Sequence, residues 1–158
     1  MRYGGVPARG GSVVPRVAVL RCISVSGFDR DRVAELLASD PYARGLGVEL
    51  GTVDDDEIVV TLEVSDAHAN FLGVGHGGMV FSLADCAFSL ASNSAGARAV
   101  AIDTHLVIIA AARPGDRLEA RVREVSRGQS LGTYRAEVCR ADGRVVALFT
   151  GTVFITPV

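Results

Sequence analysis

Eighteen consecutive residues, from Met79 to Gly96, contain a single charged side chain. Their apolar members recur at the three- and four-residue spacing of an α-helix, which predicts one long helix that Gly96 ends. A helix that is apolar on most sides has to be buried rather than rest on a surface. The rest of the chain must therefore supply a layer that packs on it. The residues that set the helical spacing are Val80, Leu83, Ala84, Ala87 and Ala91.

The other segments predict one shorter helix and six strands. Phe28–Ser39 has helical spacing, with Asp29 or Asp31 near its start. Short turns join the last four strands, so we expect these strands to pair in order as an antiparallel meander. The fold class is α+β, with one sheet on one buried helix. The expected strands are Val48–Val53 and Glu57–Val64, which form a hairpin, and then Ala99–Ala111, Asp116–Ser126, Leu131–Arg140 and Val145–Ile155.

Composition excludes several classes of protein. The chain has 158 residues, 49% of them hydrophobic and 22% charged, with a formal net charge of -2. These values indicate one globular domain and no surface for nucleic acid. No apolar run reaches the roughly 18 residues that cross a bilayer, so we expect a soluble protein with no membrane partner.

The N-terminus and the cysteines bear on domain boundaries and compartment. We expect residues 1–27 to form a flexible leader, with a short strand at Val17–Val25, and residues 28–158 to form the single domain. The leader lacks the separate basic and apolar zones of a secretory signal. The three cysteines of the chain are widely spaced and form no C-x-x-C pair. This spacing argues against a disulfide framework and favours the cytoplasm.

Asp85 is the one charged residue of the apolar helix, and no other Asp, Glu, Lys or Arg lies between Asp66 and Arg98. A carboxylate buried there without a partner would have a raised pKa and would cost roughly several kcal/mol. Such a position points to a functional acid. The structural alternative is an aspartate hydrogen-bonded to a hydroxyl such as Ser82 or Ser89.

The sequence His76-Gly77-Gly78 lies at the predicted start of the long helix. A helix N-terminus carries unpaired N–H groups and a partial positive charge, and glycines leave those groups uncovered. Each such donor can stabilise a developing oxyanion by about 3 kcal/mol. The alternative is that the glycines only permit a tight turn and that His76 is an ordinary loop residue.

The spacing between these two features predicts that they act across two chains. Asp85 lies about 12 Å along the helix axis from Gly77, which is too far for both to contact one reacting carbonyl. Two such helices that run antiparallel across a twofold interface would bring the start of one to the middle of the other. Two identical composite sites would result.

Other motifs are weaker. Residues 73–78 fit the letters G-x-G-x-x-G, but no strand precedes them and no βαβ units follow, so they do not predict a nucleotide site. The letters G-x-S-x-G at 128–132 lie at the turn between two predicted strands and not at a strand-to-helix elbow, so they do not predict a serine hydrolase. His68, His76 and His105 lack the spacing of metal ligands, and we expect no metal. Cys86 is expected to pack in the helix interface rather than react.

Several segments of the chain resemble the hotdog-fold acyl-CoA thioesterases of the phenylacetic acid degradation (PaaI) type. The segments that carry this resemblance are NFLGVGHGG (70–78), FSLADCAF (81–88), ASNS (91–94), RPGDRL (113–118), GQ (128–129) and VVALFTG (145–151). The resemblance covers roughly residues 40–155. It implies an antiparallel sheet wrapped around the long helix, a dimer with a continuous sheet, and commonly a tetramer of two dimers.

The resemblance also implies catalytic roles. Asp85 would act as general base on water or as direct nucleophile, and the Gly77 N–H would polarise the thioester carbonyl. Asn70 would position the water or the carbonyl. His76 would shape the turn and hydrogen-bond near the thioester. In the family the Asn, His and Gly come from one subunit and the Asp from the other, which agrees with the reach of the helix.

Substrate contacts follow from the same resemblance. The acyl pocket would lie along the long helix and its partner, and the phosphates of CoA would lie near basic side chains at the surface. The aromatics could equally be ordinary core, and the arginines solvated strand-end charges. The expected substrate-binding residues are Leu72, Gly78, Phe81, Phe88, Thr104, Arg113 and Arg127, with Arg98 as a further candidate.

One departure from the family concerns the attacking water. Some relatives carry a Ser or Thr on the strand after the long helix, where it helps to hold that water. The corresponding residue here is Ala101, followed by Asp103 and Thr104. Thr104 is the candidate substitute.

The sequence thus predicts a cytoplasmic acyl-CoA thioesterase that acts on phenylacetyl-CoA, hydroxyphenylacetyl-CoA or related aryl and medium-chain acyl-CoAs. A homodimer would be the minimal active unit and a homotetramer the expected assembly. No cofactor is expected, because CoA is part of the substrate. Two alternatives stay open: a hotdog hydratase or dehydratase, and a non-catalytic acyl-CoA binding or sensing module.

Overall fold

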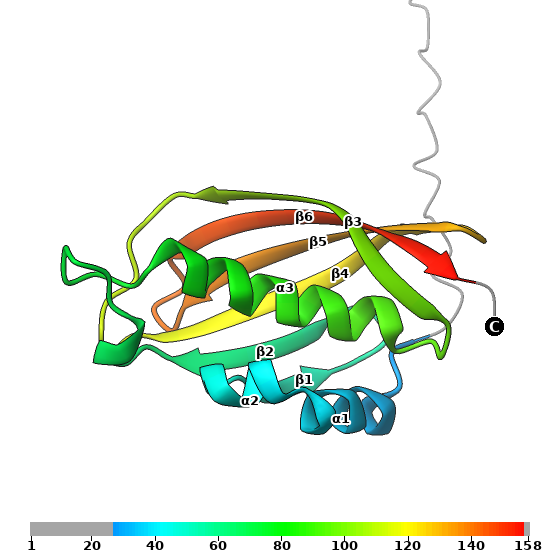
Figure 1. The fold of residues 1–158 in the computed structure, drawn as a ribbon, viewed down its shortest axis with the longest axis horizontal. Helices are drawn as coiled ribbons and strands as arrows, with labels where there is room; N and C mark the ends of the chain where they lie inside the picture. Colours follow the sequence, from blue (N-terminus) through cyan, green and yellow to red (C-terminus); the bar gives the residue numbers. More distant parts are fainter. Residues whose placement is uncertain (1–26, 157–158) are drawn as a thin grey trace, which may run out of the picture.

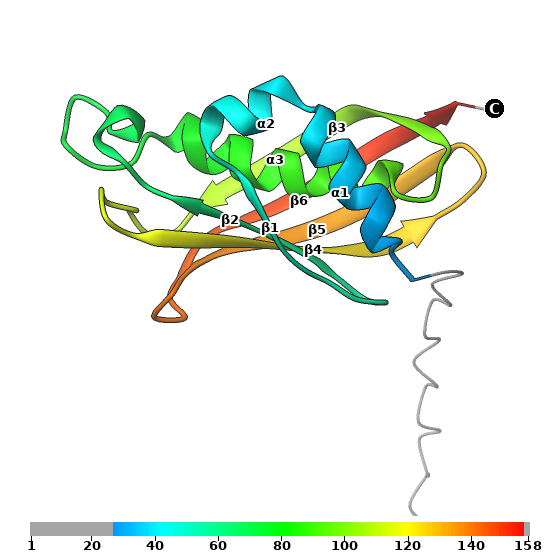
Figure 2. The ribbon, with the colours of Figure 1, turned by 90° about the horizontal axis from the view of Figure 1, so that it is seen from below.

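The computed structural model describes residues 27–156, which form a six-stranded antiparallel sheet with helices on one face (Figures 1 and 2). The predicted strand at 17–25 and the leader before residue 27 lie outside the described residues. No helix within 27–156 is long and apolar enough to span a membrane. The elements are α1 (Arg30–Ser39), α2 (Pro41–Leu46), β1 (Glu49–Val53), β2 (Ile58–Glu63), a 3-10 turn (Asp66–His68), α3 (Gly77–Asn93), β3 (Arg98–Ile108), β4 (Arg117–Arg127), β5 (Leu131–Arg140) and β6 (Val145–Thr156).

The long apolar helix is α3, and the prediction that it is buried is confirmed. Ten of its 17 residues are buried, and it packs against five of the strands. Leu83 and Phe88 are both 0% exposed, and burying a side chain of that size stabilises the fold by about 1.5–3 kcal/mol. Three polar residues, Ser82, Asp85 and Ser89, fall within an arc of about 60° on the outward side of the helix.

The strand order corrects one prediction. The order is β1-β2-β4-β5-β6-β3, so β3 pairs with β6, and β4 pairs with β2. The predicted meander is therefore wrong at its first link. Residues 109–116 are not a hairpin turn: they pass the start of α3, where Gly75 N donates to Ala112 O over 2.8 Å, and then reach β2, where Gly115 N donates to Val64 O over 2.8 Å.

The N-terminal helical region contains two helices rather than the one predicted. Asp40 ends α1 and is also the N-cap of α2, where its Oδ1 accepts from Tyr42 N (2.9 Å) and Ala43 N (3.1 Å). Pro41 occupies the first turn of α2, a position where proline costs no hydrogen bond. Gly47 ends α2 in the left-handed region, with φ 82°. Both helices contact α3.

Aromatic rings fill the middle of the core. The ring of Phe88 lies 5.6 Å from that of Tyr134 and 5.4 Å from that of Phe149. Gly151 makes this packing possible, because a Cβ there would lie 2.8 Å from the Phe88 ring. The ring of Phe81 meets Phe149 edge-on at 5.9 Å.

The strand β3 forms one edge of the sheet, and no other described strand lies beyond it. Most of its residues are exposed. Because β3 is an edge strand, the backbone N–H and C=O groups along its outer side have no strand partner. The exposed apolar side chains along β3 and just after it are Val100, Ile102, Val107, Ile108 and Ile109.

Candidate active site

The loop before α3 is a closed turn. Asn70 N donates to Val74 O over 2.7 Å, and Gly73 N donates back to Asn70 O over 2.9 Å. Gly73 has φ 74°, a conformation that favours glycine. The turn places Phe71 and Leu72 at its tip, where they are 96% and 71% exposed.

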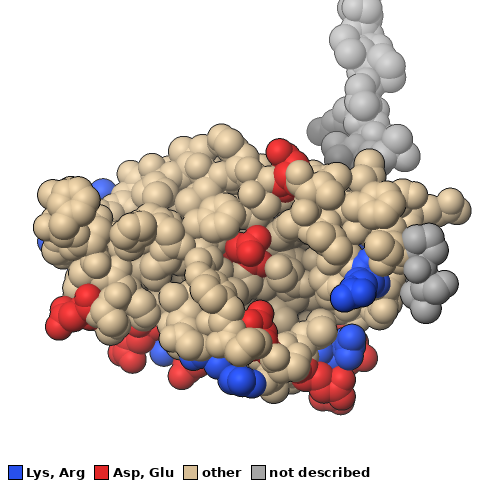
Figure 3. Space-filling view, viewed as in Figure 1, with Lys and Arg blue, Asp and Glu red and all other residues tan. Residues whose placement is uncertain are grey.

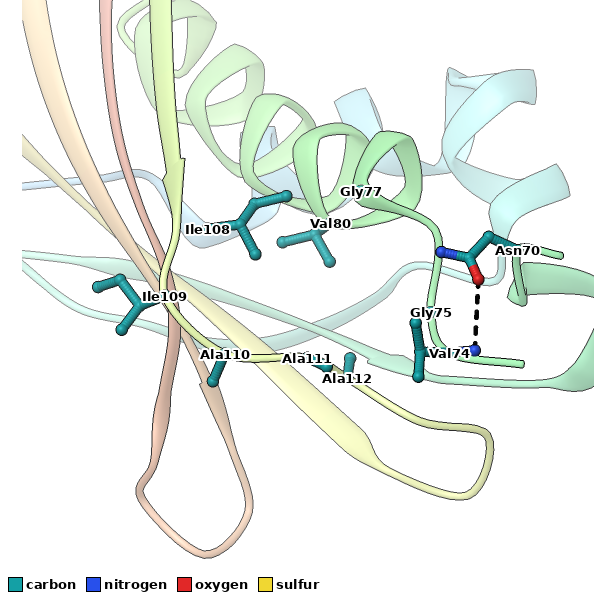
Figure 4. A pocket seen from close by; sticks show the side chains of 10 residues that line it. All are labelled: Asn70, Val74, Gly75, Gly77, Val80, Ile108, Ile109, Ala110, Ala111 and Ala112. Atoms are coloured by element: carbon teal, nitrogen blue, oxygen red, sulfur yellow. Dashed lines mark hydrogen bonds between the residues drawn. The ribbon is translucent and has the colours of Figure 1, made fainter. Parts of the chain in front are cut away.

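The side chain of Asn70 is oriented by this loop. Its Oδ1 accepts from Leu72 N (2.8 Å) and Val74 N (3.4 Å). Backbone N–H groups can only donate, so this oxygen faces the loop and the Nδ2 group faces the other way. Figure 4 shows the nitrogen on the side of the pocket and of Gly77. Asn70 Nδ2 has no hydrogen-bond partner among the described residues.

His76 caps α3. Its Nδ1 accepts from Gly78 N over 2.8 Å, so a neutral ring carries its proton on Nε2. The carbonyl of His76 accepts from Met79 N and Val80 N. Gly77 N is left as the amide of this first turn that has no partner within residues 27–156.

A pocket of about 330 Å³ opens beside this turn (Figure 4). Its wall is apolar apart from the Asn70 amide and the Gly77 backbone, so the two free N–H donors lie at the edge of an apolar space. Donors in such a setting suit a carbonyl oxygen that gains negative charge. The remaining lining residues are Val74, Gly75, Val80 and Ile108–Ala112.

Asp85 lies outside this pocket, on the outward side of α3. Its carboxylate is partly buried and forms no hydrogen bond or ion pair with another described residue. Burial raises the pKa of Asp85, and the negative charge of Asp40 raises it further. The alternative of an aspartate bonded to Ser82 or Ser89 is therefore wrong: Ser82 Oγ is instead 2.7 Å from the hydroxyl of Tyr42.

The helix that carries Asp85 lies on a face with few charges. Figure 3 shows this face largely without charged side chains, with most of the acidic and basic groups along its lower edge. Next to Asp85, burial raises the pKa of the Cys86 thiol to about 12, which keeps it protonated at neutral pH. Between residues 27 and 156, no three His, Cys, Asp or Glu side chains gather as a metal site.

The predicted aromatic substrate contacts occupy different environments. Phe88 is 0% exposed and belongs to the core, so a substrate contact by its side chain is not supported. Phe81 is half-buried against the core, and Leu72 projects from the loop tip. Thr104 is partly buried and pairs across the sheet with Gly151. Gly78 is exposed beside the pocket and is bound to His76.

The predicted basic contacts also differ. Arg127 NH1 donates to Tyr134 OH (2.6 Å) and to Ser92 O (3.1 Å), so its guanidinium is held at the C-terminal end of α3. Arg98 and Arg113 are exposed and form no ion pair with a described residue.

Two parts of the site were not predicted. Ile108–Ala112 forms a wall of the pocket, although its sequence reads only as the end of a strand. Tyr42 and Asp40, on α2, lie next to the Asp85 side of α3. Nothing in the local sequence pairs them with that helix.

Comparisons with known proteins identify the family of the chain. Residues 72–147 match the family model of the thioesterase superfamily. A Deinococcus radiodurans protein named "Putative esterase" is 46% identical over 113 residues, which is 71% of this chain and 77% of that protein. Acyl-coenzyme A thioesterase PaaI of Escherichia coli is 35% identical over 113 residues, 72% of this chain and 81% of the enzyme.

Solved structures show the same fold. The E. coli PaaI protein from the phenylacetic acid degradation operon superimposes with a TM-score of 0.77 at 31% identity, over 80% of this chain and 92% of that one. A hypothetical thioesterase from Streptococcus pneumoniae, solved with coenzyme A, gives 0.69 at 27% identity, over 72% and 91%. This chain thus belongs to the thioesterase superfamily, as a hotdog-fold thioester hydrolase of the acyl-CoA thioesterase PaaI type.

Proposed function

We propose that the chain hydrolyses phenylacetyl-CoA, hydroxyphenylacetyl-CoA or related aryl and medium-chain acyl-CoAs at a site made by two copies of the chain. The observation that carries the proposal is that the hydrogen-bond donors and the acid lie at separate places on one chain. The free donors of Asn70 and Gly77 line an apolar pocket, whereas the unpartnered carboxylate of Asp85 lies outside it. A second copy supplies the missing half of each site.

In the proposed reaction the thioester carbonyl oxygen accepts hydrogen bonds from Gly77 N–H and Asn70 Nδ2. Asp85 takes a proton from water, whose oxygen attacks the carbonyl carbon. The oxyanion that forms is stabilised by about 3 kcal/mol per donor. It then collapses, the C–S bond breaks, and the CoA thiolate leaves and takes up a proton. In a second route the Asp85 carboxylate attacks first and expels the CoA thiolate, which takes up a proton, and water then hydrolyses the resulting mixed anhydride.

Three features support the choice of substrate and its orientation. A pocket of about 330 Å³ falls within the usual size range of small-molecule sites and is apolar enough for an arylacetyl group. The free guanidinium groups of Arg98 and Arg113 suit the phosphates of CoA. The similar Streptococcus pneumoniae protein was solved with coenzyme A.

The assembly we propose is a dimer with β3 edges side by side and α3 helices antiparallel, with two dimers forming a tetramer. The unpaired edge of β3 and its exposed apolar side chains support it. We also propose a cytoplasmic location, in keeping with the free thiols of Cys86 and Cys139. The reaction needs no cofactor, because a thioester is already activated.

Subunit mixing tests the shared site. Asp85→Ala and Asn70→Asp are each expected to abolish thiol release from phenylacetyl-CoA. When the two variants are unfolded together and refolded, half of the dimers are mixed, and each mixed dimer has one intact site. The expected recovery is about one quarter of the wild-type rate.

No recovery from dimers shown by mass spectrometry to be mixed would place the whole site within one chain and overturn the proposal. Variants refolded separately and then combined without exchange are the control. The thiol-release assay also separates hydrolysis from dehydration, since dehydration frees no CoA.

A further inference from the structure

Tyr42 is an aromatic residue held in place beside the Asp85 side of α3. Its hydroxyl lies 2.7 Å from Ser82 Oγ, and Ser82 is three residues before Asp85 on the same outward strip of the helix. The side chain is nevertheless 62% exposed. The ring is thus anchored at its tip while much of its surface is free to contact another molecule.

The helix that carries Tyr42 is also close to Asp85. Asp40, the N-cap of α2, acts electrostatically on the carboxyl of Asp85 and on the thiol of Cys86. Helix α2 also contacts α3, and the pairing of Tyr42 with Ser82 places its first turn beside the outward strip of α3 that bears the proposed catalytic acid.

The position of Tyr42 in the sequence separates it from the residues of the reaction. The family model covers 72–147, which includes Gly77 and Asp85 but neither α1 nor α2. A side chain well outside the matched region that borders the acid is suited to choose among acyl groups, while the matched region, with Asn70 just before it, supplies the chemistry.

We propose that the ring of Tyr42 forms one wall of the acyl subsite and selects aryl and longer acyl groups over acetyl. This inference rests on the proposed function. The thioester carbon has to lie close to the attacking oxygen at Asp85, so an acyl group held between the Asn70–Gly77 pocket of one copy and the outward side of α3 of the other copy meets the ring. An acetyl group is too short to reach it. An aryl group gains an aromatic contact.

The test compares phenylacetyl-CoA, hexanoyl-CoA and acetyl-CoA in four proteins: wild type, Tyr42→Ala, Tyr42→Phe and Ser82→Ala. For Tyr42→Ala we expect kcat/KM to fall by about tenfold with phenylacetyl-CoA and to change less than about twofold with acetyl-CoA. Tyr42→Phe keeps the ring and should retain most of the preference. Ser82→Ala frees the ring from its anchor and should give an intermediate loss.

An equal loss with all three substrates, or an unchanged ratio of phenylacetyl- to acetyl-CoA hydrolysis, would overturn the inference. The melting temperature of each variant shows whether a loss comes from unfolding, since that affects every substrate equally. If wild-type protein releases no thiol from any of the three, the proposed function itself fails. If wild-type protein does release thiol but the ratio of phenylacetyl- to acetyl-CoA hydrolysis is the same in Tyr42→Ala, the proposed function stands and only the selection by Tyr42 is overturned.

Discussion

Asp85 occupies a position that disfavours its own charge. Burial is the main cause of its raised pKa, and Asp40 adds to it. A general base that is harder to ionise than a surface carboxylate holds its proton more strongly once it has taken it from water. The sequence predicts a functional role for this residue, because a lone acid in an apolar helix needs an explanation.

Asp85→Asn should separate stability from activity. A raised pKa in the folded state means that ionised Asp85 opposes folding above its ordinary pKa of 3.8. We therefore expect the variant to melt at a higher temperature than wild type at pH 7, with the difference vanishing as the pH falls through the raised pKa toward 3.8. Its hydrolysis rate should fall by about 10²- to 10⁴-fold. A lower melting temperature at pH 7 would show that the carboxylate has a stabilising partner.

Asp40→Asn should move the pH dependence of catalysis. Asparagine keeps the Oδ1 that caps α2 but removes the charge that acts on Asp85. The base is active only when ionised, so kcat/KM falls on the acidic side as Asp85 protonates. We expect this acidic limb to shift to lower pH in the variant, though not to the ordinary Asp pKa, because burial remains. An unmoved limb would mean that Asp40 does not act on the base.

Other residues of the proposed site could not be predicted from the local pattern of the sequence. Asn70 was assigned through family resemblance, and its orientation depends on two loop amides that only coordinates reveal. Tyr42 and Ile108–Ala112 reach the site through long-range packing. Phe88 lies at a spacing that suits either a pocket or a core, and the small residue at Gly151 decided for the core.

At the scale of elements, the start of α3 combines structure with chemistry. The side chain of His76 accepts a hydrogen bond from the amide of Gly78, whereas the amide of Gly77 has no partner among the described residues. The two glycines are therefore not equivalent, although they are adjacent and look alike in the sequence.

Replacing Gly77 or Gly78 by alanine should show that the first affects catalysis and the second affects stability. A Cβ at Gly78 would lie 2.9 Å from His76 Nδ1, so Gly78→Ala should displace the cap and cost about 0.5–2 kcal/mol of unfolding free energy. A Cβ at Gly77 would lie 3.0 Å from the flexible tip of Ile108. Gly77→Ala should therefore keep wild-type stability but narrow the pocket and lower kcat/KM. Urea unfolding and steady-state kinetics on both variants provide the comparison, and equal destabilisation would contradict it.

The elements themselves were largely predictable, and their partners less so. Periodicity and turn motifs located the long helix and all six strands, although β1 and β3 contain no fully buried residue. The sequence did not predict α2, because the same residue, Asp40, both ends α1 and begins α2. The turn at Arg113–Asp116 was recognised, but a turn motif indicates a change of direction and not which strand follows alongside. In the structure, the segment that joins β3 to β4 crosses to the other side of the sheet, where β4 pairs with β2.

At the scale of the whole molecule, the edge formed by β3 is where we expect a second copy. Ile102→Lys puts a charge on that edge at a residue that is 58% exposed. We expect the dimer to dissociate and hydrolysis to be lost, while the circular dichroism of the fold is retained. Val125→Lys is the matched control, because Val125 is 50% exposed but lies on the interior strand β4. Light scattering after size exclusion measures the outcome, and an active Ile102→Lys monomer would contradict it.

The bare edge of β3 has a consequence for the enzyme in a cell. When most chains are solitary, the concentration of complete sites grows with the square of the amount of polypeptide. Turnover per chain would then depend on abundance, so that dilution alone slows the enzyme and modest overexpression quickens it. A change in the rate of protein synthesis would then change the activity per chain without any effector molecule.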